Sequence, residues 1–233
     1  MVRRLLDLCL SVPALLVVVP VLVVSAAFVR LSSHGPVFYR AQRMGKNGRI
    51  FTMFKMRTMH CRVVAGSSIT SANDPRVFAV GRILRALKID ELPQLLNIVK
   101  GEMSIVGPRP EAVDIVARHY TAEYMQSLSV APGLTSPGSV FYYTHGEKLL
   151  ADGEAEEFYV RRLLPLKMKL DLEYLATATV LTDIQVILQT ASVLFQKALG
   201  RHNFPLPAAV SSSTGNPVLP SAVKSTTEWK SAA

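Results

Sequence analysis

Cysteine is scarce in this chain. Cys9 and Cys61 are the 2 cysteines in 233 residues, too few for the disulfide framework that stabilises many small secreted proteins. Cys9 also lies inside an apolar run. The cysteine content therefore favours a reduced protein that faces the cytosol.

Acidic residues are missing from a long stretch near the N-terminus. No Asp or Glu occurs from Leu8 to Asn73, although that stretch contains many cations: Arg30, Arg40, Arg43, Lys46, Arg49, Lys55, Arg57 and Arg62. A solvated basic face would explain isolated charges, but so many cations without a counter-charge repel one another unless an anion is bound.

The chain as a whole has a formal net charge of +9, yet only 18% of its residues are charged. Basic nucleic-acid-binding proteins normally carry many more charges. The combination favours a protein that lies on an anionic membrane lipid surface or binds a phosphorylated substrate.

Common catalytic motifs are also absent from the sequence. There is no Gly-rich phosphate loop, GxGxxG, HExxH, CxxC, GxSxG or Asp-x-Asp motif. The histidines have no metal-ligand spacing; they are His34, His60, His119, His145 and His202. These absences argue against P-loop, dinucleotide-binding and zinc-protease chemistry.

Residues 8–29 form an uncharged apolar run, which as a helix would reach ~33 Å and could cross a hydrocarbon core of about 30 Å. A secretory signal peptide would have a shorter apolar region. A simple span has no clear orientation, because Arg3 and Arg4 precede the run and Arg30 follows it. A helix that breaks near Pro20 and returns to the same face satisfies both ends, since proline lacks an N–H and clashes with the preceding turn. On these grounds alone, spanning and re-entry are equally favoured.

The rest of the chain predicts an α/β fold made mostly of helices. Short apolar segments at 37–39 and 50–54 are typical of a β-hairpin with Lys46-Asn47-Gly48 as its turn. Helices are expected at 81–87, 90–99, 111–128 and 155–199, the last one broken around Pro165. Composition divides the chain into a membrane anchor (1–32), a domain at the membrane interface (33–204) and a tail (205–233) that is expected to be disordered.

The helix expected at 90–99 begins with two carboxylates, Asp90 and Glu91. Its apolar face would consist of Leu92, Leu95, Leu96 and Val99. The macrodipole favours acids at a helix start whatever their function, so an ordinary helix start is the simplest interpretation.

The neighbourhood of this pair changes that interpretation. Arg85 and Lys88 precede Asp90 and Glu91, and Arg109 follows on a Pro-Arg-Pro loop. A carboxylate kept ionised by such cations can act as a nucleophile or a metal ligand, and the cations can bind a diphosphate.

Several short motifs occur in order between Arg3 and Gly133: Arg4-x-x-Asp7, Gly35-Pro36-Val37-Phe38-Tyr39 with Gln42-Arg43-x-Gly45, Phe54-Lys55-x-Arg57-Thr58-Met59, Asn73-Asp74-Pro75-Arg76, Gly81-Arg82 with Leu84-Arg85, Asp90-Glu91-Leu92-Pro93-Gln94, and Gly101-Glu102-Met103-Ser104-x-Val106-Gly107-Pro108-Arg109-Pro110. Each is weak alone. In this order and spacing they resemble the bacterial sugar transferase family, also called the monotopic phosphoglycosyl transferases.

The resemblance implies a reaction and a location. Members of the family transfer a sugar 1-phosphate from a nucleoside diphosphate sugar, expected here to be a UDP-sugar, to polyprenol phosphate. The transfer initiates surface polysaccharide or glycoconjugate synthesis on the cytoplasmic face of the bacterial inner membrane. The family's N-terminal anchor is a re-entrant helix–break–helix, which would place the break at Pro20, and a compact catalytic domain follows it.

The resemblance also assigns roles to residues. Asp90 would be the nucleophile that forms a covalent phosphosugar intermediate, and Glu91 would help hold the metal or assist the incoming lipid phosphate. Asp90 and Glu91 would hold Mg2+ as the cofactor. The substrate phosphates would be bound by cations on either side of the pair: Lys55, Arg57, Arg85 and Arg109.

Two departures from the family pattern limit these expectations. Many relatives have Ser before the helix-breaking proline, where this chain has Val19. Many relatives also continue differently after Thr135, where this chain has Ser136-Pro137-Gly138-Ser139-Val140-Phe141-Tyr142-Tyr143. The resemblance therefore does not identify the donor sugar.

Two alternative functions compete with the transferase. A membrane-tethered basic protein could use Arg82–Leu96 as a helix-turn-helix-like reader of nucleic acid, but Asp90 and Glu91 would place negative charge where phosphates should lie. No nucleic-acid partner is therefore expected. A catalytically inactive scaffold is the other alternative, and the intact carboxylate pair argues against it.

Overall fold

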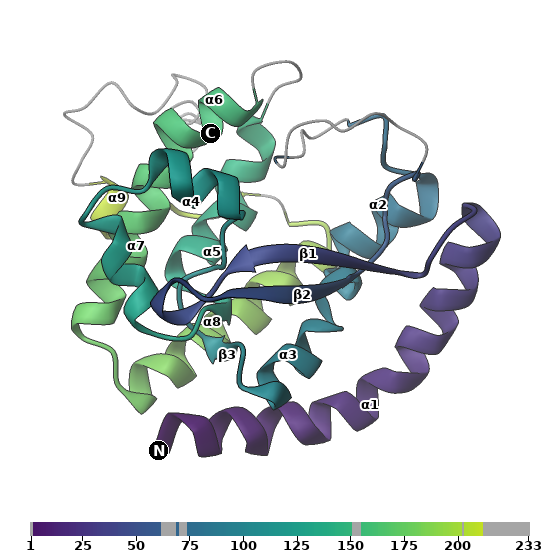
Figure 1. Ribbon diagram of the computed structural model, residues 1–233, viewed down its shortest axis with the longest axis horizontal. Coiled ribbons are helices and arrows are strands. Elements are labelled where there is room, and N and C mark those ends of the chain that lie inside the picture. The colour runs from purple at the N-terminus through teal and green to yellow at the C-terminus, as the bar shows by residue number, and fades with distance from the viewer. Residues whose placement is uncertain (1, 62–68, 70–73, 151–154, 202, 212–233) are drawn as a thin grey trace, which may run out of the picture.

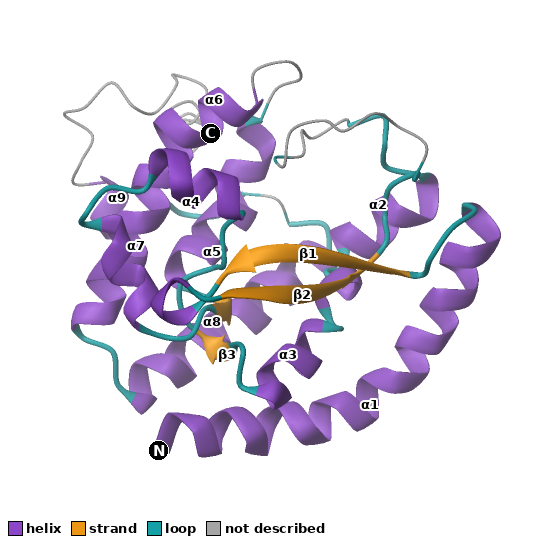
Figure 2. Cartoon of the chain, in the orientation of Figure 1, coloured by secondary structure: helices purple, strands orange, loops and turns teal. Residues whose placement is uncertain are grey.

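The computed structural model describes residues 2–61, 69, 74–150, 155–201 and 203–211. A long N-terminal helix, α1 (Val2–Ser32), runs along the outside of a mostly helical domain, and a two-stranded hairpin lies across that domain (Figures 1 and 2). The expected fold class, a mostly helical domain with a short hairpin behind an N-terminal apolar helix, is confirmed.

The N-terminal helix is continuous, although Pro13 and Pro20 lie inside it. It curves along its length instead of dividing into two helices (Figure 1). Proline bends a helix without ending it where packing supports the surrounding turns. The break expected at Pro20 was therefore wrong: the helix continues through this residue and only curves.

One face of α1 packs on the domain while the other is exposed. Leu15 and Val18 pack against the core beside the hairpin, and Val29 is fully buried at the other end. The outer face is almost wholly apolar, with exposed Val2, Leu5, Leu10, Val12, Leu16, Val17, Val19, Val21, Val23, Val24, Phe28 and Leu31. The helix is long and apolar enough to cross a membrane, and an exposed apolar face of this extent is typical of a membrane contact.

The start of α1 is fixed to the domain by polar contacts. Arg4 donates to the carbonyls of Ile98 and Val99, at 2.5 and 2.7 Å. The Oδ1 atom of Asp7 accepts from the backbone N–H of Ile105 at 2.8 Å. The other end of the helix is also bound to the domain, through Ser33. Both ends of the helix therefore contact the same domain.

The hairpin consists of β1 (Phe38–Met44) and β2 (Ile50–Met56), paired antiparallel with Ala41 opposite Met53. Its turn is η1 (Lys46–Gly48), where Asn47 and Gly48 have φ of 55° and 72°. Asn and Gly tolerate this left-handed region. The predicted hairpin and its turn are confirmed.

Two short helices follow the hairpin, α2 (Ala79–Ala86) and α3 (Gln94–Lys100), separated by the single turn η2 (Ile89–Glu91). The expected apolar face of α3 is confirmed for Leu95, which is buried, but it was wrong for Leu96, which is exposed while Ile98 is fully buried. The buried face instead includes two polar residues, Gln94 and Asn97. Asn97 is satisfied by the backbone of β2, since it accepts from the N–H of Phe54 and donates to the carbonyl of Thr52.

The remaining elements form the second half of the domain: β3 (Ser104–Val106), α4 (Val113–His119), η3 (Tyr124–Ser129), β4 (Gly133–Thr135), α5 (Pro137–Phe141), η4 (Tyr142–Gly146), η5 (Glu147–Leu149), α6 (Ala155–Phe158), η6 (Tyr159–Leu163), α7 (Leu164–Ala176), α8 (Val180–Ala198) and α9 (Ala208–Ser211). β3 and β4 pair in parallel. α6, η6 and α7 follow one another without an intervening loop, and the change from η6 to α7 lies beside Pro165, whose missing N–H costs nothing in the first turn of α7. A loop separates α7 from α8.

The tail prediction was wrong for its first residues. Leu206, Ala209 and Val210 pack against the largest core cluster, and Val210 is almost fully buried. A composition rich in Ser, Thr and Pro hid these few apolar contacts. The rest of the predicted tail, 212–233, lies outside the described residues.

Candidate active site

The turn between α2 and α3 carries the carboxylate pair. Asp90 and Glu91 lie in η2, and they are 5% and 8% exposed. Lys88, immediately before the turn, has φ of 56°, an uncommon conformation for a residue with a side chain. Unlike ordinary helix-start acids, which face water, both carboxylates point into the domain.

Glu91 is the centre of a buried cation cluster. Its Oε1 lies 3.2 Å from the Nζ of Lys55, which comes from β2. Arg109, from the loop after β3, donates to both carboxylate oxygens, with Nη1 at 3.0 Å from Oε2. Glu91 therefore holds together two cations that come from distant parts of the chain.

The electrostatics of this cluster follow from burial and charge. Burial alone would raise the pKa of Glu91, but Arg109 and then Lys55 hold the pKa well below its usual range. Burial lowers the pKa of Lys55, and the charge of Glu91 partly offsets that effect. The ion pairs thus keep Glu91 as a carboxylate inside the domain.

Asp90 differs from Glu91 in its hydrogen bonding and in the direction of its pKa shift. Its Oδ1 is buried and has no hydrogen-bond partner within the described part of the chain. Burial, followed by the charge of Glu91, raises the pKa of Asp90, while Lys55, Lys88 and Arg85 oppose the rise. A poorly solvated carboxylate oxygen of this kind is available to a substrate or an ion.

The structure separates the other two cations that the sequence grouped with these. Arg85 lies beside the pair, since its charge lowers the pKa of Asp90 and its Nε donates to Thr58 Oγ1 at 2.9 Å. Arg57 is 5% exposed and points to the end of α1. It donates to the hydroxyl and carbonyl oxygens of Ser33, both at 2.7 Å, and to the carbonyl of Pro36. These contacts indicate that Arg57 stabilises the fold at the end of α1.

Gln94 is a further candidate site residue, and the sequence did not reveal that its amide is buried. It is 1% exposed, and neither amide atom has a hydrogen-bond partner among the residues described. It lies one helical turn after Glu91, on the same buried face of α3 as Asn97. Its position in the Asp-Glu-Leu-Pro-Gln motif was the available signal.

The described residues contain no group of three or more His, Cys, Asp or Glu side chains that could hold a metal ion. A cation at this site would therefore depend on few protein oxygens. Mg2+ is often bound in that way, through one or two carboxylates together with substrate phosphates.

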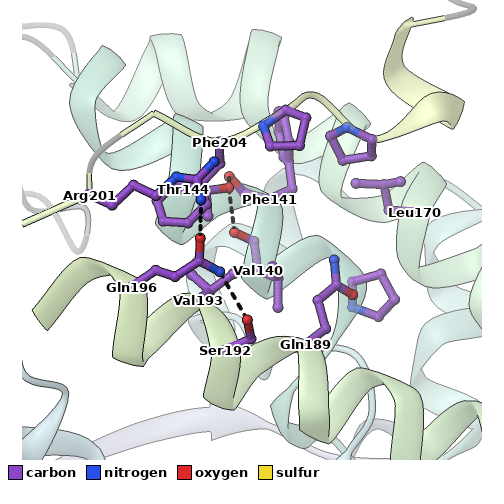
Figure 3. A pocket seen from close by; sticks show the side chains of 13 residues that line it. Val140, Phe141, Thr144, Leu170, Gln189, Ser192, Val193, Gln196, Arg201 and Phe204 are labelled. Atoms are coloured by element: carbon purple, nitrogen blue, oxygen red, sulfur yellow. Dashed lines mark hydrogen bonds between the residues drawn. The ribbon is translucent and has the colours of Figure 1, made fainter. Parts of the chain in front are cut away.

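A separate cavity of about 470 Å³ lies between α8 and a segment that contributes Arg201, Phe204, Pro205 and Pro207 (Figure 3). Val140, Phe141 and Leu170 contribute apolar walls. On one side Arg201 donates to Gln196, which in turn donates to Ser192. None of the predicted site residues lines this cavity, so it is distinct from the carboxylate site.

Comparisons with known proteins find a matching family model and several relatives. Residues 1–197 match the family model described as bacterial sugar transferase. The chain is 37% identical over 195 residues to an undecaprenyl-phosphate glucose phosphotransferase of Komagataeibacter xylinus, covering 81% of this chain and 35% of that protein. It is 36% identical over 197 residues to a UDP-glucose:undecaprenyl-phosphate glucose-1-phosphate transferase of Caulobacter vibrioides, covering 82% and 69%.

A further relative acts on another sugar by its name. A UDP-N-acetylgalactosamine-undecaprenyl-phosphate N-acetylgalactosaminephosphotransferase of Aeromonas hydrophila is 32% identical over 194 residues, covering 81% of this chain and 42% of that protein. The chain thus spans about a third to two thirds of the length of these relatives. The family model covers most of the chain, from the apolar helix through the carboxylate site to α8. This chain belongs to the bacterial sugar transferase family.

Proposed function

We propose that this protein transfers a sugar 1-phosphate from a UDP-sugar to a polyprenol phosphate at the cytoplasmic face of the membrane, with Asp90 as the nucleophile. The observation that carries the proposal is a buried oxygen of Asp90 that has no hydrogen-bond partner among the described residues and lies beside the Glu91–Lys55–Arg109 cluster. Relatives whose names specify UDP-sugars and undecaprenyl phosphate support these substrates.

The proposed chemistry has two displacements at one phosphorus atom. In the first, an oxygen of Asp90 attacks the sugar-bearing phosphorus, and the bond to the nucleoside monophosphate breaks, so that this group leaves with the electron pair. In the second, an oxygen of the polyprenol phosphate attacks the same phosphorus and the bond to Asp90 breaks. The carboxylate is regenerated, and no net proton or electron is required.

The surroundings of Asp90 suit both displacements. Asp90 is 5% exposed, which keeps water from a covalent phosphosugar ester. Lys55 and Arg109 are fixed near it by Glu91 before any substrate arrives. Cations that are already placed can stabilise charge on the transferring and departing phosphates without reorganisation. We assign Glu91 this positioning role.

Mg2+ fits the residues in part. Asp90 offers a buried carboxylate oxygen without a partner in the described chain, and hard cations take such oxygens. Glu91, also expected as a ligand, already has both oxygens bound by Arg109. We therefore propose that Asp90 and the substrate diphosphate would hold the ion. When bound, Mg2+ offsets negative charge on the diphosphate.

The alternative functions find little support in the geometry. α3, which would be the recognition helix of a helix-turn-helix, packs against α1 and β2 with Gln94, Leu95, Asn97 and Ile98 buried. A reader of the major groove needs that face exposed. An inactive scaffold would retain the fold but not the turnover.

The test is nucleotide release by purified protein in detergent micelles with Mg2+, polyprenol phosphate and each of a panel of nucleoside diphosphate sugars. We expect release of nucleoside monophosphate with one donor and a matching sugar-diphosphate lipid product. Heat-denatured protein is the control. If no donor in a panel that includes UDP-glucose and UDP-N-acetylgalactosamine supports release, the protein is a scaffold and the proposal fails.

A further inference from the structure

A second cation cluster adjoins the carboxylate turn, built from residues that the proposed mechanism does not use. Lys88 Nζ lies 2.8 Å from Glu147 Oε1 and 4.1 Å from the centroid of the Tyr143 ring. Lys197 of α8 lies 3.3 Å from the same centroid, and its Nζ is 4.0 Å from Glu147 Oε2. We call these four residues the lysine–tyrosine cluster.

We propose that the lysine–tyrosine cluster is the binding subsite for the phosphate of the polyprenol acceptor. The inference rests on the proposed function and extends it, because nothing in the mechanism above says where the second substrate binds. The ligand is a phosphate monoester anion attached to an apolar chain.

The position of the cluster places it at the reacting centre. Lys88 is two residues before Asp90, and its charge acts on both carboxylates of the turn. Tyr143 is bound to the end of α2, since its hydroxyl donates to the carbonyl of Ala86 at 3.0 Å. A phosphate held by Lys88 would therefore lie next to the covalent phosphosugar on Asp90.

The charge of the cluster favours an anion. Its four described side chains carry two ammonium groups and a single carboxylate. Glu147 has 37% of its side chain exposed and Lys88 has 25%, so a phosphate can approach from solvent or the membrane surface. A phosphate would compete with Glu147 for Lys88 and would offer a stronger, doubly charged acceptor.

The rim of the cluster suits a lipid. Ile83 of α2 and Leu87 just after it are 58% and 50% exposed, and Phe195 of α8 and Leu199 just after it are 67% and 72% exposed. Exposed apolar side chains on both neighbouring helices can contact an isoprenoid chain, whereas a nucleoside needs polar partners. The first cluster, at Glu91, remains available for the donor diphosphate.

The test compares kinetics for the two substrates in two variants. Lys197→Met should raise KM for polyprenol phosphate about tenfold, because a charge-assisted contact is lost. Glu147→Gln should act in the opposite direction and lower that KM about threefold, because it removes the competing carboxylate. A merely structural ion pair would not give opposite signs. Both variants should leave the donor KM and the acceptor-free burst of nucleoside monophosphate unchanged.

Matched controls are Lys46→Met, an exposed lysine in the hairpin turn, and Glu157→Gln, an exposed partner of Arg161. Neither should change either KM. Inorganic phosphate should inhibit competitively against polyprenol phosphate and not against the donor. If the donor KM changes instead, the lysine–tyrosine cluster binds the nucleotide donor and the inference is overturned. If Glu147→Gln weakens acceptor binding or neither variant has an effect, the inference is overturned.

Equilibrium binding separates this inference from the proposed reaction. Radiolabelled short-chain polyprenyl phosphate can be titrated in detergent micelles with the Asp90→Asn protein, which needs no turnover. The same opposite shifts in Kd should follow from adding Lys197→Met and Glu147→Gln. Shifts in Kd without any turnover in the unsubstituted protein would contradict the proposed function and leave the phosphate subsite standing. Turnover in the unsubstituted protein without those shifts in Kd would support the proposed function and overturn the phosphate subsite.

Discussion

Arg109 donates hydrogen bonds to both carboxylate oxygens of Glu91, with Nη1 at 3.0 Å from Oε2 and Nη2 at 2.5 Å from Oε1. Lysine cannot form this bidentate hydrogen-bonded pair, although it keeps the positive charge. Arg109→Lys should therefore raise the donor KM about tenfold or more, because the cation is no longer fixed for the diphosphate. Steady-state kinetics with varied donor measure this. Arg118→Lys, at an exposed pair with Asp114, is the control, and an unchanged donor KM in Arg109→Lys would refute the role.

Arg57 is expected to affect stability and not donor binding. Its guanidinium is buried and donates to Ser33, Pro36 and Met59, which join the end of α1 to the hairpin. Arg57→Lys should destabilise the fold by about 2–3 kcal/mol through lost hydrogen bonds to a buried cation. Thermal unfolding in detergent measures the shift, and the donor KM should stay within about twofold of the unsubstituted value. A large rise in KM with unchanged stability would restore Arg57 as a phosphate-binding residue.

The attachment of α1 at both ends predicts its topology. Arg4 and Asp7 bind the domain at one end and Ser33 at the other. In a Cys9→Ser, Cys61→Ser background, single cysteines at Val2→Cys and His34→Cys should therefore react with a membrane-impermeant thiol reagent from the same side of sealed vesicles. Labelling of the two positions from opposite sides would show a simple span.

Asp171 predicts a pH dependence of stability. Burial raises the pKa of Asp171 to about 6, while the N–H of Gly138 donates to its Oδ1 and opposes the rise. The unfolded chain loses this proton near pH 4 and the folded chain near pH 6, so the unfolding free energy falls as pH rises across that window. Asp171→Asn cannot ionise and should gain up to about 3 kcal/mol relative to the parent between pH 4 and 7. Thermal midpoints across that range test it, with exposed Asp114→Asn as the control. A difference that does not change with pH would disprove it.

The sequence predicted the parts of the site that depend on contiguous residues. Asp90 and Glu91 could be found because they open a short motif among cations, and the hairpin could be found because Asn47 and Gly48 mark its turn. Contacts between residues that are far apart in the chain could not be predicted from such local motifs. Charge alone made Arg57 and Arg109 equivalent, and only the fold directs one to Ser33 and the other to Glu91.

Buried polar residues defeated the sequence pattern elsewhere. Gln94 and Asn97 occupy the buried face of α3. Because these residues are polar, apolar periodicity pointed to a different face of the helix and predicted Leu96 in the core. Lys88 and Lys197 meet at Tyr143 across more than a hundred residues. β3 and β4 have three residues each and are too short for alternation to reveal them.

The most direct test of the account is the covalent state of Asp90 itself. The protein is incubated with its donor and Mg2+ but without polyprenol phosphate, quenched in acid, and analysed by intact and peptide mass spectrometry. We expect one phosphosugar per chain, located on the peptide that contains Asp90, and its disappearance when acceptor is added. Asp90→Asn should form no adduct, whereas Asp114→Asn, an exposed acid on α4, should form it normally. An adduct of equal yield in Asp90→Asn, or full turnover by that variant, would contradict the assignment of Asp90 as the nucleophile.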